Sequence, residues 1–418
     1  MERMGNPVVV VGAGAAGIIA AWKAATDGAR VILLEKTPRI GTKILISGGG
    51  KCNITHAGPV EEVLKEFRVN EARFLRPSFY RFTNEDVLHL LTDRGLQVYT
   101  RPNGRVFPVE QTAKDVVAVL ERLLDEVGVQ VILESPITKL IHTDGQVRGV
   151  ETPAGEIKAS HVVLSTGGSS YPKSGTTGDG WPWARELGHR VVPVRAALAP
   201  IELPLEQGAE WAGVSLRDVT LKARANGKEV ARWREDLLFT HHGISGPNAL
   251  GISREVEEAK VHHEVALEVD LLPIETFEQL QQRLQRYKQQ NPNRRAIYLV
   301  DSAAPAVLQE PILIQARIDP YQICQSITSK QINILAETLK SWKLGKVSRV
   351  PIEKGEVVAG GIDLNEVDPK TMLSKKAQHL SICGEVLDVA GPVGGYNLQA
   401  AFSTGFVAGE SAVKTVIS

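Results

Sequence analysis

A glycine-rich turn near the start of the chain constrains the fold more than any other feature. An apolar run at residues 8–11 leads directly into Gly12, Ala13, Gly14, Ala15, Ala16 and Gly17. Gly12 permits a tight strand-to-helix turn, Gly14 lets a pyrophosphate approach the backbone, and Gly17 lets the helix pack closely on the sheet. The pattern predicts a Rossmann-type dinucleotide cradle with the phosphates at the helix N-terminus.

An acidic residue completes this cradle. The helix is expected to end at Gly28, and a second apolar strand at residues 31–34 is followed by Glu35. At this position a carboxylate accepts hydrogen bonds from both ribose hydroxyls and repels a 2′-phosphate. FAD and NAD are the two alternatives that this pattern leaves open.

Length and charge limit the classes of protein to which the chain can belong. A chain of 418 residues exceeds what one hydrophobic core usually spans, so we expect two domains or one domain with a large insertion. Lys plus Arg equals Asp plus Glu at 48 each, so no overall field favours nucleic acid or an anionic membrane. We therefore expect a small-molecule substrate and no nucleic-acid partner, with the oligomeric state open.

Cysteine usage and hydropathy indicate a cytoplasmic location. Cys52, Cys324 and Cys383 are odd in number and widely spaced, which argues against disulfides and metal sites and fits a reducing compartment. No apolar run reaches about 18 residues, so we expect no membrane span. The short, polar start of the chain is not typical of a signal peptide.

The order of elements predicts an α/β fold. Residues 112–127 have helical apolar spacing and lead to a third parallel strand at 129–133. Residues 137–150 alternate around a turn and form an antiparallel meander, after which residues 161–165 return to the main sheet. This order is typical of a Rossmann-like domain of the glutathione-reductase type with a β-meander.

A change of pattern indicates a large inserted α+β domain. Prolines cluster around residues 195–204, alternating strands follow through 267–269, and the pattern is helical from 274 to about 344. We expect His262 and His263 in a strand. We predict a first FAD-binding segment at residues 1–194, an inserted domain at residues 195–350 and a C-terminal FAD-binding segment at residues 351–418.

A second glycine-rich constellation lies near the C-terminus. A strand at 379–383 runs into Gly384 and Glu385, and a long helix is expected from about Leu398. A glycine–acid pair at a strand end can hydrogen-bond a sugar-alcohol chain. The helix N-terminus offers free N–H groups and the positive end of a dipole, which suits the pyrimidine side of a reduced flavin.

A third such segment, expected to be a loop, spans residues 41–53. Gly48, Gly49 and Gly50 remove side chains where a flat ring or a diphosphate needs contact with backbone, and Lys43 and Lys51 are placed to offset phosphate charge.

Other residues allow both a functional and a structural interpretation. For Cys52 the two hypotheses are a redox-active thiol and a packed residue that positions the backbone, and we favour the second. For His241 and His242 they are contact with a substrate and structural hydrogen bonding. For Tyr396 they are stacking on a flavin and packing in the core.

These motifs together resemble the BaiN-like family of FAD flavoproteins, which includes aminoacetone oxidases and a bile-acid-pathway reductase. The segments that carry the resemblance are 12–17, 43–53, 165–168, 177–180, 238–247 and 384–399. It extends over essentially the whole chain. This sequence has Lys51 where arginine is common in the family and Thr42 where a basic residue is common, and neither change affects the expected cofactor.

The resemblance implies FAD bound across the Rossmann-like domain, with an inserted domain over the flavin face. The ADP half would be held by Gly12, Ala13, Gly14, Ala15, Ala16, Gly17, Glu35 and Lys36, with Ile137 meeting adenine through its backbone. The diphosphate and ring would be lined by Lys43, Gly48, Gly49, Gly50, Cys52 and Asn53 and supported by Thr166, Gly167 and Gly168. Gly384 and Glu385 would face the ribityl chain, and Gly395, Asn397 and Leu398 the pyrimidine edge.

The expected activity is that of an FAD-dependent oxidoreductase. It either reduces an activated C=C bond with NAD(P)H as a transient donor or oxidises a small amine with O₂; the absence of a second GxGxxG cradle mildly favours an oxidase. Because flavin itself performs the redox chemistry, no catalytic acid or base is assigned. The alternatives are a flavin-dependent tRNA-modifying enzyme and a non-catalytic, flavin-stabilised binding protein.

Overall fold

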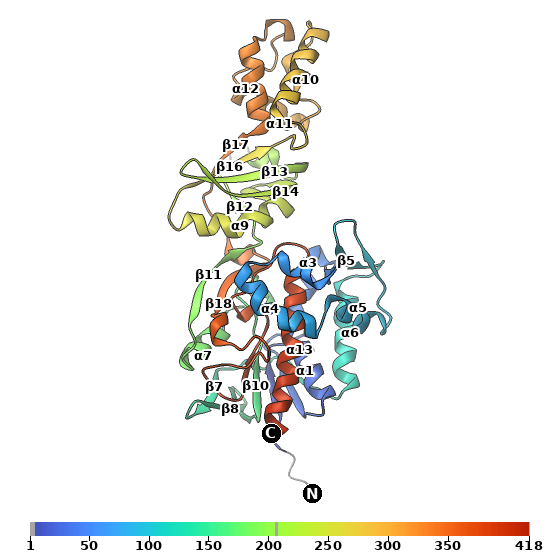
Figure 1. The fold of residues 1–418 in the computed structure, drawn as a ribbon, viewed down its shortest axis with the longest axis vertical. Helices are drawn as coiled ribbons and strands as arrows, with labels where there is room; N and C mark the ends of the chain where they lie inside the picture. Colours follow the sequence, from blue (N-terminus) through green and yellow to red (C-terminus); the bar gives the residue numbers. More distant parts are fainter. Residues whose placement is uncertain (1–4, 205–207, 418) are drawn as a thin grey trace. The chain divides into compact units, whose positions relative to one another are not determined.

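The computed structural model describes residues 5–204 and 208–417, which form two compact units (Figure 1). The first unit extends to Arg195 and resumes at Glu356, and the second is Ala196–Gly355. The roles of the two units as an FAD-binding domain and an inserted domain remain proposals.

A parallel sheet forms the centre of the first unit. Its strand order is β19-β10-β1-β2-β6, and every neighbouring pair is parallel. The strands are β1 (Val8–Val11), β2 (Val31–Leu34), β6 (Gln130–Ile132), β10 (His161–Leu164) and β19 (Leu380–Ile382). The four valines of β1 are buried because helices cover a parallel sheet on both faces. The predicted third parallel strand and the return of residues 161–165 to this sheet are confirmed.

Two helices pack in backbone contact beside this sheet. They are α1 (Ala15–Thr26) and α13 (Tyr396–Ile417), and a Cβ on Gly405 would lie 2.2 Å from the carbonyl oxygen of Ala16. The helix α13 begins at Tyr396, slightly earlier than expected. A third helix, α6 (Ala113–Glu126), begins with a capping box in which Thr112 and Asp115 satisfy each other's backbone amides.

Smaller elements complete the first unit. The meander is confirmed as β7 (Lys139–Thr143), β8 (Gln146–Thr152) and β9 (Gly155–Lys158). The other elements are β3 (Thr55–His56), β4 (Val98–Thr100), β5 (Arg105–Pro108), β11 (Val191–Ala197), β18 (Val357–Ile362), α2 (Thr42–Ile46), α3 (Val60–Lys65), α4 (Val69–Arg81), α5 (Asn84–Thr92) and α7 (Gly180–Glu186). The segment expected to be a loop at 41–53 contains α2 and a 3-10 turn, Ser47–Gly50, so that expectation was wrong in part.

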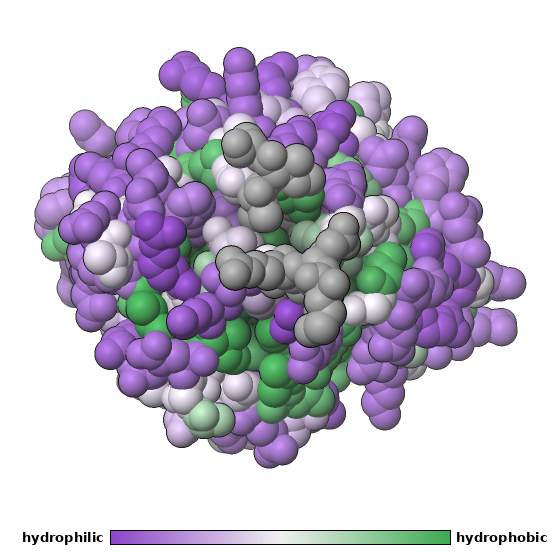
Figure 2. All heavy atoms as spheres, turned by 90° about the horizontal axis from the view of Figure 1, so that it is seen from below, coloured by the Kyte–Doolittle hydropathy of each residue, from purple (hydrophilic) through white to green (hydrophobic). Residues whose placement is uncertain are grey.

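The face of the first unit at which α13 ends has hydrophilic side chains around its rim and apolar side chains between them (Figure 2). In the described part of the chain, we find no helix with the length and apolar character needed to cross a membrane.

An antiparallel sheet forms the centre of the second unit, with strand order β12-β15-β14-β13-β16-β17. Its strands are β12 (Ile201–Glu202), β13 (Ser215–Ala225), β14 (Lys228–Thr240), β15 (Gly243–Ser245), β16 (Val265–Asp270) and β17 (Trp342–Lys346). Its helices are α8 (Gly208–Trp211), α9 (Gly246–Lys260), α10 (Phe277–Gln290), α11 (Ala306–Gln315) and α12 (Ser329–Lys340). Within this unit α9 lies on the opposite side of the strands from α10, α11 and α12 (Figure 1).

Two predictions of secondary structure from the sequence concern the second unit. The helix over 278–290 is confirmed, with Leu280 and Leu284 as its buried residues. The placement of His262 and His263 in a strand is wrong, because their amides both donate to the carbonyl of Ala259 and close the end of α9. Alternation of polar and apolar residues therefore begins only at Val265.

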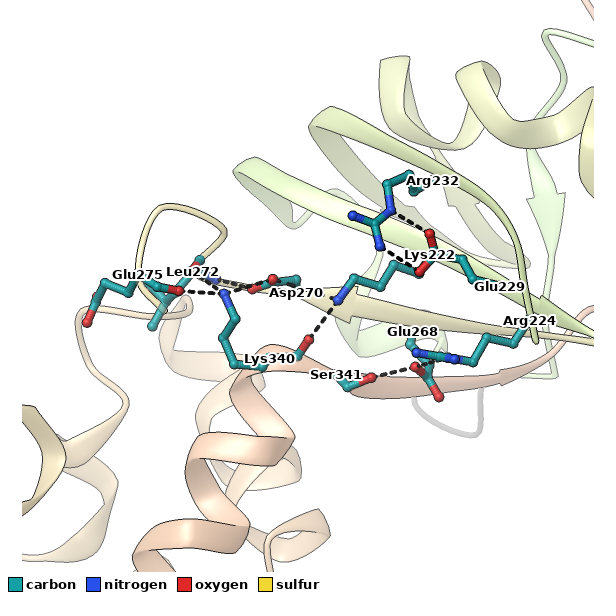
Figure 3. Close-up of polar contacts among 10 residues, drawn as sticks. All are labelled: Lys222, Arg224, Glu229, Arg232, Glu268, Asp270, Leu272, Glu275, Lys340 and Ser341. Carbon is teal, nitrogen blue, oxygen red and sulfur yellow. Dashed lines mark hydrogen bonds and ion pairs between the residues drawn. The ribbon is translucent and has the colours of Figure 1, made fainter. Parts of the chain in front are cut away.

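An ion-pair network joins the strands of this sheet to α12 (Figure 3). The Asp270 carboxylate lies 2.8 Å from the Lys340 ammonium and 3.8 Å from that of Lys222. Lys340 also donates to the carbonyl of Leu272, at 2.8 Å. The Asp270 side chain is only 10% exposed, so water screens these charges little.

We predict that Asp270→Ala lowers the free energy of unfolding by about 3 kcal/mol, because it leaves two partly buried ammonium groups without their carboxylate. Urea denaturation of the variant measures this. Asp236→Ala is the control, since its partner Arg217 is exposed and such pairs contribute at most about 1 kcal/mol. Equal, small effects of both substitutions would contradict the role given to Asp270.

Candidate functional site

The glycine turn between β1 and α1 leaves backbone accessible at one position and packs tightly at two others. A Cβ on Gly17 would lie 1.9 Å from the carbonyl oxygen of Gly12, and a Cβ on Gly12 would lie 2.7 Å from that of Ser165. A Cβ on Gly14 would meet no atom within 4 Å. Gly12 and Gly17 therefore serve the turn and the packing, while the backbone at Gly14 is open to a ligand.

The N-terminus of α1 has free amides. No side chain caps Gly14 among the described residues, and the first helical hydrogen bond runs from the Ile18 amide to the Gly14 carbonyl, at 3.0 Å. The amides that precede Ile18 in α1 have no acceptor within the described chain. Together with the helix dipole they make a site for an anion such as a pyrophosphate.

The carboxylate of Glu35 lies against this turn. One of its oxygens accepts from the amide of Ala13 and the other from that of Thr37, both at 2.8 Å. Each carboxylate oxygen has two lone pairs, so capacity remains for ribose hydroxyls. Lys36, the next residue, instead pairs with Asp179 at 2.5 Å and donates to Thr177, which ties it to the neighbouring loop.

The C-terminal strand end lies beside the same cradle. A Cβ on Gly384 would lie 2.7 Å from the Cβ of Ala16 in α1, since β19, β10 and β1 are consecutive in the sheet. Glu385 forms an ion pair with Lys43 at 2.5 Å and accepts from the amide of Val358 at 3.0 Å. Segments more than 300 residues apart in the sequence therefore meet here.

The Lys43 ammonium is the centre of this polar group. Besides Glu385 it reaches the hydroxyl of Ser170, at 2.8 Å. Sequence reasoning missed Ser170, and no local signal distinguishes it from other loop serines. A Cβ on Gly168 would lie 2.9 Å from the carboxylate of Glu385, so this glycine is required by contact with a predicted site residue.

The glycines at 48–50 all have left-handed backbone, with φ of +56°, +67° and +84°. Other residue types adopt this conformation at a cost. A Cβ on Gly49 would meet nothing within 4 Å, which leaves a second stretch of backbone open. With its amide oriented to satisfy its neighbours, Asn53 accepts from the amide of Gly395 at 3.0 Å, which links this segment to the start of α13.

The side chain of Asn397 holds the loop that precedes α13. It accepts from the amide of Gly391 at 2.8 Å and donates to the carbonyl of the same residue at 2.9 Å. Leu398 is half-buried in the first turn of α13, and Ile137 is half-buried just before the meander. The Thr166 hydroxyl is buried and has no hydrogen-bond partner within the described residues, and Gly167 beside it has a φ of +73°.

The thiol of Cys52 is buried. Desolvation raises its pKa to about 12, although a hydrogen bond with Ser47 opposes the rise, so the thiol stays protonated at neutral pH. The protonated state argues for the packed role of this residue and against a redox role.

We predict that Cys52→Ser keeps most turnover and most bound flavin, because a hydroxyl fits the same volume and can donate where the thiol does. Flavin content and initial rates of purified protein measure this. Loss of turnover by about 100-fold with flavin still bound would instead assign the thiol to the chemistry.

Tyr396 packs in the core. Its ring stacks on His56 with centroids 4.7 Å apart, and Phe67 meets it edge-on. Burial raises the pKa of its phenol to about 12. His241 and His242 are exposed at the turn between β14 and β15 of the second unit.

These features fit a dinucleotide cofactor. Backbone is open at Gly14 and Gly49, the amides at the start of α1 lack acceptors within the described chain, and Glu35 offers a carboxylate at the strand end. Fold and site together define a protein with a Rossmann-type dinucleotide cradle. The chain belongs to the family described as HI0933-like protein Rossmann domain, which it matches over residues 6–411. This confirms the resemblance drawn from the sequence motifs.

Curated relatives share the whole length of the chain. It is 30% identical to a ribosomal RNA dihydrouridine synthase of Haemophilus influenzae over 95% of this chain and 96% of that protein. It is 29% identical to a 3-dehydro-bile acid delta(4,6)-reductase of Clostridium scindens, over 98% and 99% of the two chains. A solved 3-ketosteroid delta1-dehydrogenase of Sterolibacterium denitrificans has a similar fold, with a TM-score of 0.54 and 14% identity over 98% and 99% of the chains.

The chain is accordingly an FAD-dependent oxidoreductase, as predicted from the sequence. Of the two cofactors that the glycine pattern left open, the family supports FAD.

Proposed function

We propose that this enzyme reduces a carbon–carbon double bond conjugated to a carbonyl group, with FAD as the hydride carrier and NAD(P)H as the electron donor. The observation that carries the proposal is the similarity over both units to two curated enzymes whose names describe related chemistry. Dihydrouridine is uridine with hydrogen added across a C=C bond next to a carbonyl. A 3-dehydro-bile acid delta(4,6)-reductase saturates C=C bonds conjugated to a ketone.

The residues of the cradle have distinct tasks in this proposal. The amides at the start of α1 bind the pyrophosphate, and Glu35 accepts from the adenosine ribose. When bound, FAD supplies hydride transfer to the substrate. The ion pair with Glu385 and the hydrogen bond to Ser170 fix the Lys43 ammonium on this side of the cradle, with its charge largely offset by the carboxylate.

Two substrate classes satisfy this chemistry. One is a small enone such as a 3-oxo steroid, and the other is a uracil base within RNA. Both accept a hydride at the carbon β to the carbonyl and a proton at the α carbon, so the reaction consumes one NAD(P)H per double bond.

Anaerobic stopped-flow measurements test the reaction class. The purified flavoprotein is mixed with NADPH or NADH, and the reduced protein then with a 3-oxo-4-ene steroid or a uridine-containing RNA. The proposal expects bleaching by a nicotinamide, and reoxidation by one of the two acceptors with loss of one double bond per flavin. Bleaching by aminoacetone but by neither nicotinamide, with reoxidation by O₂ alone, would overturn it in favour of amine oxidation.

A further inference from the structure

A local excess of positive charge lies in the helical part of the second unit. Between Glu278 and Asp301 the chain has five Lys or Arg residues and no Asp or Glu. The chain as a whole has zero net charge, and this balance hides the local excess. The cations of this segment are Arg283, Arg286, Lys288, Arg294 and Arg295.

Three of these cations, from segments that lie side by side, have no carboxylate partner within the described residues. Arg283 is ion-paired with Glu275 at 2.9 Å. Within the described chain, no carboxylate pairs with Lys288, Arg294 or Arg295. The two arginines are exposed, and Lys288 is half-buried and close enough to Cys324 to lower the pKa of its thiol, which burial raises more strongly.

Exposed tyrosines lie against these arginines. The guanidinium of Arg294 is 5.3 Å from the ring centroid of Tyr298, and that of Arg295 is 5.7 Å from the ring of Tyr321. Tyr298 and Tyr321 are 47% and 56% exposed. Each tyrosine thus has a guanidinium near its ring and about half of its surface exposed to solvent, at some cost in free energy.

Backbone hydrogen bonds fix the two segments that carry these side chains. The amide of Cys324 donates to the carbonyl of Arg294 at 2.7 Å, and the amide of Ala296 to that of Gln322 at 2.8 Å. We call the set Lys288, Arg294, Arg295, Tyr298 and Tyr321 the basic–aromatic surface. Asp319 is a carboxylate at its edge, where it accepts from the amide of Tyr321 at 2.9 Å.

We propose that the basic–aromatic surface binds RNA. Unpaired arginines and a lysine neutralise phosphates, and exposed tyrosine rings stack on unpaired bases, which is the combination that single-stranded nucleic acid requires. A membrane surface would instead favour a broad face of exposed aliphatic side chains beside the cations, whereas Ile323, at 45% exposure, is the one exposed large aliphatic side chain in residues 288–298 and 319–324. An acidic protein segment would have no use for the aromatic faces. The inference rests on the proposed function, in which uracil in RNA is one of two substrate classes.

Fluorescence anisotropy with a fluorescein-labelled stem–loop RNA, its loop rich in uridine, tests this inference. The variant carries Lys288→Gln, Arg294→Gln and Arg295→Gln. We expect its affinity at low salt to fall about tenfold or more, and the slope of log affinity against log[KCl] to be less steep by about 2. Tyr321→Ala is expected to weaken binding about fivefold with an unchanged salt slope, because stacking releases no counterions.

A matched control distinguishes a specific effect of this surface from the effect of lowering the net positive charge anywhere on the protein. Lys114→Gln, Lys158→Gln and Lys228→Gln together remove the same charge from exposed positions elsewhere, and the inference expects near-native binding. Equal losses in both triple variants would overturn it. So would tighter binding of anionic phosphatidylserine vesicles or of poly-glutamate than of RNA, each measured under the same conditions.

The RNA-binding measurement and the reductase measurement can fail independently of each other. If the proposed function holds, NAD(P)H should still reduce the flavin of the basic–aromatic variant at the wild-type rate, because this step is the same for both substrate classes. Lost RNA binding without any reductase activity in the wild type would support the RNA surface and refute the proposed function. Unchanged RNA binding by the basic–aromatic variant, with reductase activity present in the wild type, would refute the RNA surface and support the proposed function.

Discussion

Glu35→Arg is expected to weaken FAD binding about 100-fold, so that the purified variant loses its flavin on dilution. The substitution removes an ionised acceptor from the ribose hydroxyls, and hydrogen bonds to charged groups contribute about 1.5–3 kcal/mol each. It also removes the carboxylate that accepts from the amides of Ala13 and Thr37. Calorimetric titration of apoprotein with FAD measures the change.

Glu35→Gln is the matched control for this substitution. It keeps one acceptor oxygen but places an NH₂ group where the second oxygen accepts from a backbone amide. We therefore expect an intermediate loss of FAD affinity and a loss of about 1 kcal/mol in the free energy of unfolding. Flavin retention by Glu35→Arg equal to that of wild type would contradict the placement of the ribose at this carboxylate.

A pair of glycine substitutions separates cofactor binding from folding. Gly17→Ala puts a Cβ 1.9 Å from a backbone oxygen, so we expect it to lower the free energy of unfolding by about 3 kcal/mol. Gly14→Ala meets no protein atom and has a φ of −80°, which alanine adopts readily. We expect its stability to stay within about 1 kcal/mol of wild type.

FAD affinity is expected to be sensitive to the substitution at Gly14, which leaves the stability of the protein nearly unchanged. In Gly14→Ala the added methyl group occupies the open side of the turn, so FAD affinity should fall at least about tenfold in a protein of normal stability. Denaturant unfolding without FAD and titration with FAD measure the two effects. Normal FAD affinity in Gly14→Ala would show that the pyrophosphate does not pass over this residue.

Much of the first unit could be predicted because its signals are local. The run of four valines in β1, the spacing of the glycines in the turn and the apolar face of α6, which has a period of 3.6 residues, all depend only on neighbouring residues. The prediction failed at His262 and His263, where a helix end was mistaken for a strand. Over so few residues, alternation alone does not distinguish the two.

The candidate site was predictable in its residue types but not in its contacts. Glycine and an acid at strand ends indicated a cradle, yet the pairing of Lys43 with Glu385 joins positions more than 300 residues apart. The burial of Cys52 and the use of Asn397 to hold its own loop likewise depend on packing. The tyrosines beside Arg294 and Arg295 were not recognised, because Tyr321 comes from a separate segment.

The amino-acid sequence by itself determined the parallel sheet, the glycine turn and the expectation of a dinucleotide, because backbone conformation and apolar patterns are properties of short segments. The tertiary structure alone decided which charges are paired, which thiol is protonated and which surface cations have no carboxylate partner among the described residues. Those properties depend on distances and dielectric surroundings that arise only when remote segments pack together.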